Sequence, residues 1–286
     1  MNPEMGLRPM TESDLPFADS LRAEVKWNQT LGDWQRMLAQ SPQGCFIAEW
    51  NGVPAGTATT ICYGKELAWI GMLLVRPDYR GRGIGRALLD RCLNYLRAVG
   101  ISGIKLDATP QGKLLYDRLG FGKEWPITRW ETLRLDTPLA GARKEIRAFA
   151  AADFDAITQL DGVAFGAMRP PVLKHLLDQG CQTCVHQAAG EIAAYGMIRE
   201  GSRAKYLGPV AATSSVAGVA LIGALLTAVV GEPVYWDIPD PNVEASALAK
   251  RLGFSPQRRL VRMSLGVNSR SGNPQQYFAI ADPAVG

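Results

Sequence analysis

Residues 75–89 read Val-Arg-Pro-Asp-Tyr-Arg-Gly-Arg-Gly-Ile-Gly-Arg-Ala-Leu-Leu, and this stretch decides the fold. It predicts the end of an apolar strand, a loop rich in glycine and arginine, and the start of a helix. The glycines allow positive φ angles and a close approach of the backbone to a ligand. Free N–H groups at a helix N-terminus attract anions, and arginines pair with phosphate oxygens. The stretch therefore predicts a cradle for a pyrophosphate.

Two other phosphate-binding motifs do not fit this loop. No Gly-Lys-Ser/Thr follows it, as a P-loop requires. Arg86 stands where a dinucleotide fingerprint has its third glycine, and no Asp or Glu closes a second strand about twenty residues later. The run from Arg80 to Gly85 instead follows the pattern Arg/Gln-x-x-Gly-x-Gly/Ala.

This pattern resembles the acetyl-CoA-binding loop of the GNAT family of N-acyltransferases. The resemblance spans roughly residues 7–133 and includes the apolar strand at 69–75, the lead-in Val-x-Pro-x-Tyr-Arg and the downstream run Leu115-Tyr116-Asp117-Arg118-Leu119-Gly120-Phe121. It implies that acetyl-CoA is the cosubstrate. It also implies which residues bind acetyl-CoA: Leu73, Leu74, Val75, Arg80, Gly81, Arg82, Gly83, Ile84, Gly85 and Tyr116.

The composition is that of an ordinary soluble globular protein, with 47% apolar and 20% charged residues among 286. This length predicts about two domains. A formal charge of +4 is too small to indicate nucleic acid or a membrane surface as a partner. The uncharged stretch 213–231 approaches the length of a membrane span, but its glycines, alanines and flanking prolines favour a buried helix.

The five cysteines argue for a reducing compartment. Their number is odd and no signal peptide precedes them, which predicts a cytoplasmic protein. Cys181 and Cys184 are spaced like half of a zinc site, but they fall beside and on a predicted strand, where residues three apart face opposite sides. No second pair completes a site, so we expect no metal.

The two halves of the chain contain similar sequence segments in the same order. Three matched pairs carry this similarity: Leu7-Arg8-Pro9-Met10 with Ile146-Arg147-Ala148-Phe149, Cys45-Phe46 with Cys184-Val185, and Arg118-Leu119-Gly120-Phe121 with Arg251-Leu252-Gly253-Phe254. In the first pair, an aspartate follows each segment: Asp14 follows Met10, and Asp153 follows Phe149. Self-similarity at this long period predicts two copies of one domain. We place the first at residues 1–136 and the second at 144–286.

The hydrophobic pattern of the first copy predicts an α/β fold, an α+β mixed sheet with helices on both faces. We expect strands near 6–10, 44–50, 54–62, 67–75, 103–108 and 121–134. We expect helices near 12–22, 30–39, 83–99 and 111–118. Two tandem GNAT-type acyl-CoA N-acyltransferase domains would have this architecture.

The second copy has lost the cradle. Aligning Ala87-Leu88-Leu89 with Ala224-Leu225-Leu226 sets Arg80, Arg82, Gly83 and Gly85 opposite Ala217, Val219, Ala220 and Ile222. Aligning the Arg-Leu-Gly-Phe motifs sets Tyr116 opposite Ala249. We therefore expect the second copy not to bind acetyl-CoA in the same way. The chain resembles tandem GNAT proteins whose first domain is catalytic and whose second domain is degenerate.

The resemblance implies that Tyr116 is the general acid for the departing thiolate, since a phenol has a pKa not far above that of a thiol. A packed tyrosine with a tied hydroxyl is the alternative. The base that deprotonates the amine stays open between Asp107, Asp237 and a water relay. Neither histidine has a partner pattern that indicates a triad.

In the family the acceptor lies over the first two helices, where Trp27, Asn28 and Gln29 fall. These residues, with Asp237 from the second copy, are the predicted acceptor contacts. The alternative for this segment is a helix N-cap at Thr30 and a core tryptophan at Trp34.

The leading interpretation is a cytoplasmic acetyltransferase that moves an acetyl group from acetyl-CoA to a primary amine of a small molecule in a ternary complex. One alternative is an acyltransferase with a longer acyl-CoA or a peptide acceptor. Another is a non-catalytic acetyl-CoA sensor. The presence of Tyr116, the implied general acid, argues against a sensor. We expect a monomer or weak dimer, because the second copy can satisfy the surface on which single-domain relatives pair.

Overall fold

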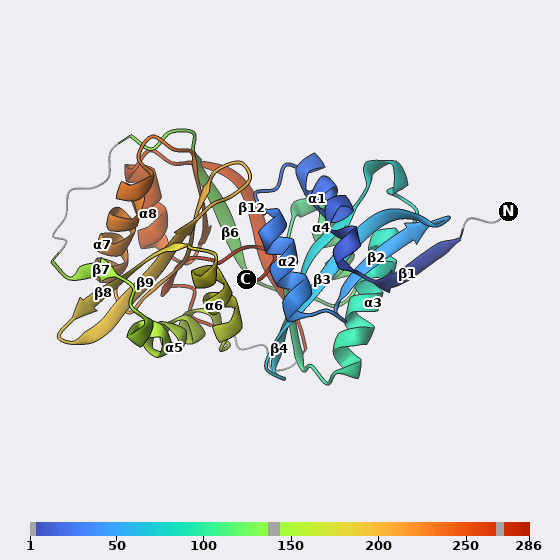
Figure 1. The fold of residues 1–286 in the computed structure, drawn as a ribbon, viewed down its shortest axis with the longest axis horizontal. Coiled ribbons are helices and arrows are strands. Elements are labelled where there is room, and N and C mark those ends of the chain that lie inside the picture. The colour runs from blue at the N-terminus through green and yellow to red at the C-terminus, as the bar shows by residue number, and fades with distance from the viewer. Residues whose placement is uncertain (1–3, 137–143, 267–271) are drawn as a thin grey trace. The chain divides into compact units, whose positions relative to one another are not determined.

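The computed structural model describes residues 4–136, 144–266 and 272–286, which form two compact units (Figure 1). The first unit takes in the described chain as far as Leu106, with residues 264–266 and Val285 from the C-terminal part. The second unit holds Asp107–Met263, most of the remaining C-terminal residues and Gly286. The linker expected between residues 136 and 144 falls outside the described residues.

The sheet of the first unit runs in the order β1 (Met5–Pro9), β2 (Cys45–Trp50), β3 (Val53–Tyr63), β4 (Leu67–Val75) and β5 (Gly103–Ala108). Neighbours from β1 to β4 are antiparallel, whereas β4 and β5 are parallel. These strands match the predicted ones to within one or two residues.

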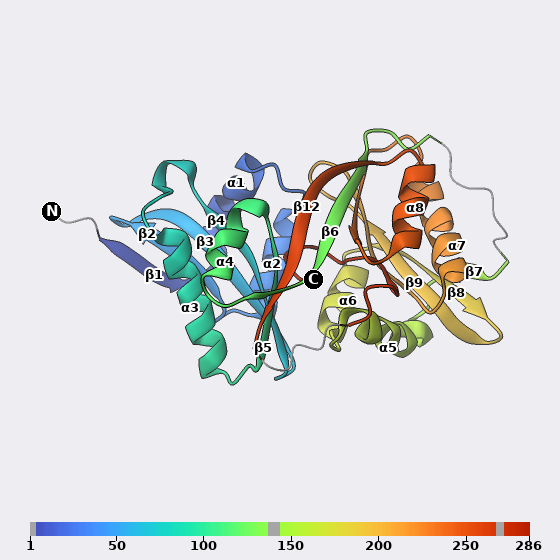
Figure 2. The same ribbon diagram turned by 180° about the vertical axis from the view of Figure 1, so that it is seen from behind.

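Helices cover both faces of this sheet, as the sequence predicts. A 3-10 turn (Glu12–Asp14), α1 (Leu15–Glu24) and α2 (Leu31–Gln40) lie on the face seen in Figure 1, and α3 (Ile84–Ala98) lies on the face seen in Figure 2. The sequence predicts an apolar stripe on this helix that ends at Val99. The structure buries its other six members, Ile84, Leu88, Leu89, Cys92, Leu93 and Leu96, but leaves Val99 44% exposed at the C-cap. Gly56 on β3 allows α3 to approach, because a Cβ there would lie 3.1 Å from Leu88 and 2.8 Å from the carbonyl oxygen of Leu74.

The sheet of the second unit runs in the order β12 (Ser255–Leu265), β6 (Gly122–Thr132), β11 (Val234–Pro239), β10 (Lys205–Ala212), β9 (Glu191–Arg199), β8 (Gln182–Ala188) and β7 (Ile146–Ala148). A short strand, β13 (Tyr277–Ala279), pairs with β10 outside this order. The helices of this unit are α4 (Pro110–Asp117), α5 (Phe154–Phe165), α6 (Pro170–Asp178), α7 (Ser215–Leu226) and α8 (Val243–Arg251). Short 3-10 turns fall at Ala151–Asp153 and Thr227–Val229 in this unit, and at Pro77–Tyr79 in the first unit.

The compact units do not follow the repeat boundary expected from the sequence. The last strand of the first repeat, β6, belongs to the second unit, where it pairs antiparallel with β11 from Thr132–Val234 to Ile127–Pro239. It lies between β11 and β12, the two strands that would otherwise be neighbours in the second repeat. Backbone pairing therefore sets the division near Leu106, ahead of the end of the first repeat.

The structure shows the predicted duplication in atomic detail. Arg8 forms a bidentate pair with Asp14, with both N–O distances 2.7 Å, and Arg147 does the same with Asp153 at 2.6 and 2.7 Å. In each copy the aspartate also accepts the N–H of the residue three positions earlier, over 2.8 Å.

The uncharged stretch 213–231 forms α7 and a following 3-10 turn, and α7 lies in the apolar core of the second unit. This confirms the buried helix that the flanking residues predict. In the described ranges, no helix combines the length and apolarity needed to cross a membrane.

Candidate acyl-CoA site

Strands β4 and β5 separate part of the way along their length. Their parallel register pairs Leu67 with Gly103 and ends with Trp69 opposite Lys105. The stretch from Ile70 to Val75 continues beside β3 only, so its other edge has no recorded strand neighbour in the described chain. The predicted contacts Leu73, Leu74 and Val75 lie on this unpaired stretch.

A bulge in β4 falls at the point of separation. Thr57 pairs with Leu74 and Thr59 with Gly71, so β4 carries one more residue than β3 over this interval. Met72 within it has a φ of 48°, which is uncommon for a residue with a side chain. The Thr57 hydroxyl donates to the Met72 carbonyl oxygen over 2.8 Å and holds this conformation. Bulges re-aim backbone groups next to active sites.

The conformation of Met72 is not predictable from the residue itself, because a methionine gives no signal of positive φ. The run of polar threonines at 57, 59 and 60 inside an otherwise apolar strand was the available signal, since a buried hydroxyl needs a partner.

The glycine loop leads from β4 into α3 with the geometry of an anion cradle. Gly81 and Gly83 have φ angles of 76° and 82°, and a Cβ at either position would meet nothing within 4 Å. Gly83 is the N-cap of α3, and the first recorded backbone bond of the helix start runs from the Ala87 N–H to the Gly83 carbonyl oxygen. The N–H groups of Ile84, Gly85 and Arg86 have no recorded acceptor among the described residues, as expected of a first helical turn.

The loop arginines are exposed and differ in how they are held. Arg80 donates from Nε to the Val75 carbonyl oxygen over 3.1 Å. Arg82 donates to the Asp78 carbonyl oxygen over 3.1 Å and lies over the rings of Trp50 and Tyr79. Exposed glycines, open N–H groups and guanidinium groups together fit a pyrophosphate, and the unpaired edge of β4 fits an extended arm.

Tyr116 lies on α4 and is 8% exposed. Its ring packs edge to face against Phe121, with the ring centroids 5.8 Å apart. Thr109 caps the helix by accepting the Gly112 N–H, and a Cβ at Gly112 would lie 3.0 Å from the tyrosine ring. Tyr116 belongs to the second unit, whereas the loop belongs to the first.

Family models match both halves of the chain. The model described as the acetyltransferase (GNAT) family matches residues 10–121, and the model of an acetyltransferase (GNAT) domain matches residues 157–279. The chain belongs to the GNAT family.

It is therefore an acyltransferase built from two GNAT domains, which confirms the predicted fold class and enzyme class. It is 25% identical over 286 residues to the holothin acyltransferase of a Pseudoalteromonas species, covering 98% of this chain and 94% of that protein. It is also 25% identical over 190 residues to the uncharacterized N-acetyltransferase YitH of Bacillus subtilis, covering 66% of each.

A solved structure shows the same fold along the whole chain. A putative acetyltransferase from Pyrococcus horikoshii superposes with a TM-score of 0.85 and 24% sequence identity. The match covers 99% of this GNAT chain and 96% of that structure.

The predicted acceptor residues lie in the connection between α1 and α2. Asn28 and Gln29 are buried, at 3% and 2% exposed, whereas Trp27 is half-buried. Thr30 forms a capping box with Asp33, and Trp34 is fully buried, so the N-cap and core roles considered for these two residues are confirmed. Trp27 is the member of the predicted set whose side chain is most open to solvent.

Both candidate carboxylate bases are fully enclosed in ion pairs. Asp237 accepts two bonds from Arg129 at 2.8 and 2.5 Å and one from the Tyr206 hydroxyl at 3.0 Å. Burial opposes its charged form, but the charge and hydrogen bonds of Arg129 outweigh this and lower the pKa of Asp237. Asp107 pairs with Arg262 at 2.9 and 3.0 Å, and burial raises the pKa of Asp107 in spite of that arginine.

The second GNAT domain has the same strand separation, but its own chain fills it. Strands β10 and β11 pair in parallel only from Lys205–Val234 to Leu207–Trp236. Beyond this point β13 pairs with β10, with Val210 opposite Ala279 and Ala211 opposite Tyr277. The Trp236 indole donates to the Phe278 carbonyl oxygen over 2.8 Å.

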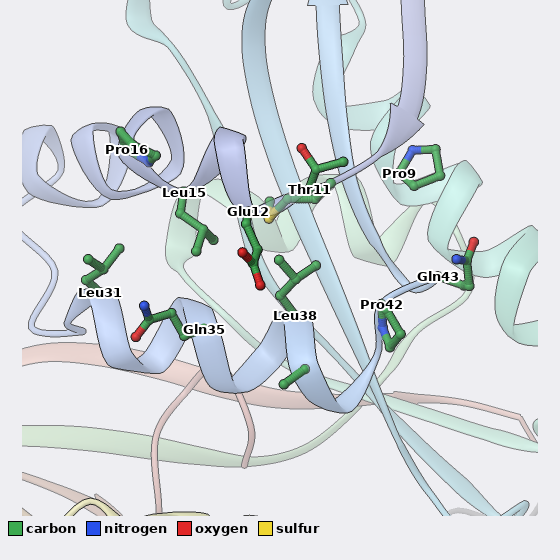
Figure 3. A pocket seen from close by; sticks show the side chains of 12 residues that line it. Pro9, Thr11, Glu12, Leu15, Pro16, Leu31, Gln35, Leu38, Pro42 and Gln43 are labelled. Carbon is green, nitrogen blue, oxygen red and sulfur yellow. The ribbon is translucent and has the colours of Figure 1, made fainter.

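A separate groove lies over α1 and α2 in the first unit (Figure 3). It encloses about 700 Å³, and Glu12 is its one carboxylate. Its lining consists of Pro9, Met10, Thr11, Glu12, Leu15, Pro16, Leu31, Gln35, Leu38, Ala39, Pro42 and Gln43. It therefore contains none of the residues predicted to bind acetyl-CoA or the acceptor. Within the described ranges, no group of three or more His, Cys, Asp or Glu side chains is placed to hold a metal ion.

Proposed function

We propose that this protein transfers an acetyl group from acetyl-CoA to a primary amine of a small-molecule acceptor, by direct attack in a ternary complex. One observation carries the proposal: the unpaired edge of β4 runs directly into a glycine loop with open N–H groups and exposed arginines. When bound, acetyl-CoA supplies the acyl thioester.

In this proposal the first repeat, residues 1–136, is catalytic. The backbone of Leu73, Leu74 and Val75 pairs with the pantetheine arm, and the segment from Arg80 to Gly85 holds the pyrophosphate. The β4 bulge aims backbone N–H groups at the charge that develops on the reacting carbonyl oxygen. Holding amine and thioester together removes much of the entropic barrier to their reaction.

Tyr116 is the proposed general acid, which donates its phenolic proton to the leaving sulfur. Of the three base candidates, a water relay is the best supported. Asp107 and Asp237 are both buried in bidentate pairs with arginines, and neither presents an open oxygen to an amine.

The proposed acceptor contacts are Trp27, Asn28, Gln29 and Asp237. Asp237 comes from the degenerate second repeat at residues 144–286. Of these four residues, Trp27 has the best structural support, because its side chain is half-buried whereas Asp237 is fully buried in its pair with Arg129.

A longer acyl donor is the second candidate function. The relative that aligns along nearly the whole chain is named an acyltransferase of holothin, a name that does not restrict its donor to acetyl-CoA. The donor and the acceptor are therefore tested together.

The test measures thiol release from acetyl-CoA and from longer acyl-CoAs with a panel of amines, amino acids, polyamines, amino sugars, heterocyclic amines and peptides. Arg82→Ala serves as the variant that weakens the donor site. We expect turnover of acetyl-CoA with at least one small amine and a raised KM for acetyl-CoA in the variant. Turnover only with longer acyl-CoAs would favour the second candidate. Failure of the wild-type protein to bind any acyl-CoA would refute both.

A further inference from the structure

One loop arginine is held in place by two aromatic rings. The guanidinium of Arg82 lies 5.2 Å from the centroid of the Trp50 ring and 5.3 Å from that of Tyr79. Its terminal nitrogen also donates to the Asp78 carbonyl oxygen over 3.1 Å. Contacts within about 6 Å of a ring face are attractive, and tryptophan gives the strongest of them.

The neighbouring arginines are held differently. Arg80 is tied by its Nε to the backbone of Val75, and Arg86 pairs with Asp90 one turn along α3 at 2.7 Å. Arg76 lies over the Tyr79 ring, at 5.2 Å. Among the described residues, Arg82 is the loop arginine whose guanidinium lies over a ring that another element supplies, the ring of Trp50 on β2.

Trp50 is brought to the loop by strand pairing. It is the last residue of β2 and pairs with Val53 across the hairpin turn. The start of β3 then runs beside the end of β4, where the Arg76 N–H donates to the Ala55 carbonyl oxygen over 2.9 Å. The ring therefore stands on a rigid element, whereas Arg82 stands on an exposed loop.

We infer that Trp50 is a positioning residue for acyl-CoA binding: its ring holds the Arg82 guanidinium beside the N-terminus of α3, ready for the pyrophosphate. This inference rests on the proposed function. A free arginine side chain loses rotamer freedom when it binds a phosphate, and a brace that orders it beforehand reduces that loss. Tyr79 completes the brace from within the loop.

The test is a double-mutant cycle on CoA affinity, measured by titration calorimetry. The proteins are wild type, Trp50→Leu, Arg82→Ala and the double variant, each checked for its thermal unfolding midpoint. We expect Trp50→Leu to weaken CoA binding about two- to fivefold, the range of a cation–π contact at an exposed site. In the Arg82→Ala background, the same substitution should change affinity by less than the measurement error, because the residue through which Trp50 acts is gone.

Two controls separate positioning from a general effect on the fold. Trp50→Phe keeps a ring and should restore most of the affinity. Trp50→Leu combined with Arg86→Ala should still show the two- to fivefold loss, because Arg86 is held by Asp90 and not by the ring.

An equal loss in the presence and absence of Arg82 would overturn the inference, since Trp50 would then contact CoA directly or merely support the hairpin. No loss in Trp50→Leu would overturn it as well. Absence of CoA binding to the wild-type protein is a different result, because it refutes the proposed function itself.

Discussion

Ile280 donates its backbone N–H to the carbonyl oxygen of Asp237 over 3.1 Å, at the place where β10 and β11 separate. The C-terminal segment thus bonds to both strands that border the gap. The repeat alignment sets Val210 opposite Leu73 and Ala211 opposite Leu74, and these are the residues of β10 that β13 pairs with. The second domain therefore uses its own chain where the first is proposed to hold a pantetheine arm.

This occupied gap predicts that the protein binds one acyl-CoA per chain. Titration calorimetry with CoA should give a stoichiometry near one, and Arg82→Ala should weaken that single site. The physical reason is that β13 already uses the backbone groups of β10 and that the second repeat lacks the arginines. A stoichiometry of two, with one site unchanged in Arg82→Ala, would contradict this prediction.

Gly218 shows how tightly the segment is packed. The alignment sets it opposite Gly81 of the cradle, and a Cβ at Gly218 would lie 2.6–2.8 Å from atoms of the Phe278 ring. Gly218→Val should therefore lower the free energy of unfolding by about 1–3 kcal/mol, the usual effect of overpacking a core. Urea unfolding at neutral pH measures this change.

The matched control lies on the same helix. Val216 is 79% exposed, so Val216→Ala should change stability by less than about 0.5 kcal/mol. Combining Gly218→Val with Phe278→Ala should cost less than the sum of the two single losses, because the clash is removed. Full additivity would mean that the ring and the glycine do not interact.

The sequence predicted those features that depend on local pattern. The α3 stripe and the start of that helix at Gly83 are short-range relations. The repeated Arg8…Asp14 and Arg147…Asp153 segments were recognised as marks of the duplication, but their ion pairs were not predicted. The pairing of β6 with β11 was not predictable in this way, because the repeat pattern favours pairing within each copy.

The same limit applies to the candidate site. Strand 67–75 and the glycine loop were read from adjacent residues, but the positive φ of Met72 depends on the register against β3. The contact of Trp50 with Arg82 joins residues 32 positions apart in the chain, through a hairpin whose twist no single-residue pattern encodes. Burial of Asn28, Gln29 and Asp237 likewise follows from tertiary packing.

Tyr116→Phe tests the proposed acid without changing the shape of the ring. Loss of the phenolic proton should lower kcat by roughly 10²-fold or more, the usual contribution of a positioned acid. The dissociation constant for CoA should stay within about twofold, because the edge-to-face contact with Phe121 is kept. Steady-state kinetics and calorimetry on the same preparations separate the two effects.

The control for that variant removes the ring packing as well as the phenolic proton. Tyr116→Leu loses both the hydroxyl and the ring contact with Phe121, so it should lower the unfolding midpoint by more than Tyr116→Phe does. An unchanged kcat in Tyr116→Phe would show that the hydroxyl is not the acid.

The free energy of unfolding at acidic pH should depend on Asp14. The hydrogen bonds from Arg8 lower the pKa of Asp14 to about 2 in the folded protein, against an ordinary value of about 3.9. Because the folded pKa is the lower one, the stabilisation is fully present above about pH 4 and is lost as the pH falls towards 2. We expect it to amount to about 1–2 kcal/mol, since Arg8 is partly exposed.

Asp14→Asn should therefore reduce the free energy of unfolding by about that amount at pH 7 and flatten its decline between pH 4 and 2. Urea unfolding at a series of pH values measures both effects. Asp78→Asn is the control, because that side chain is 82% exposed and its nearest cationic nitrogen, on Arg76, lies 3.9 Å away. A surface pair of this kind contributes little, so an equal loss in both variants would show that the Arg8–Asp14 pair has no special role.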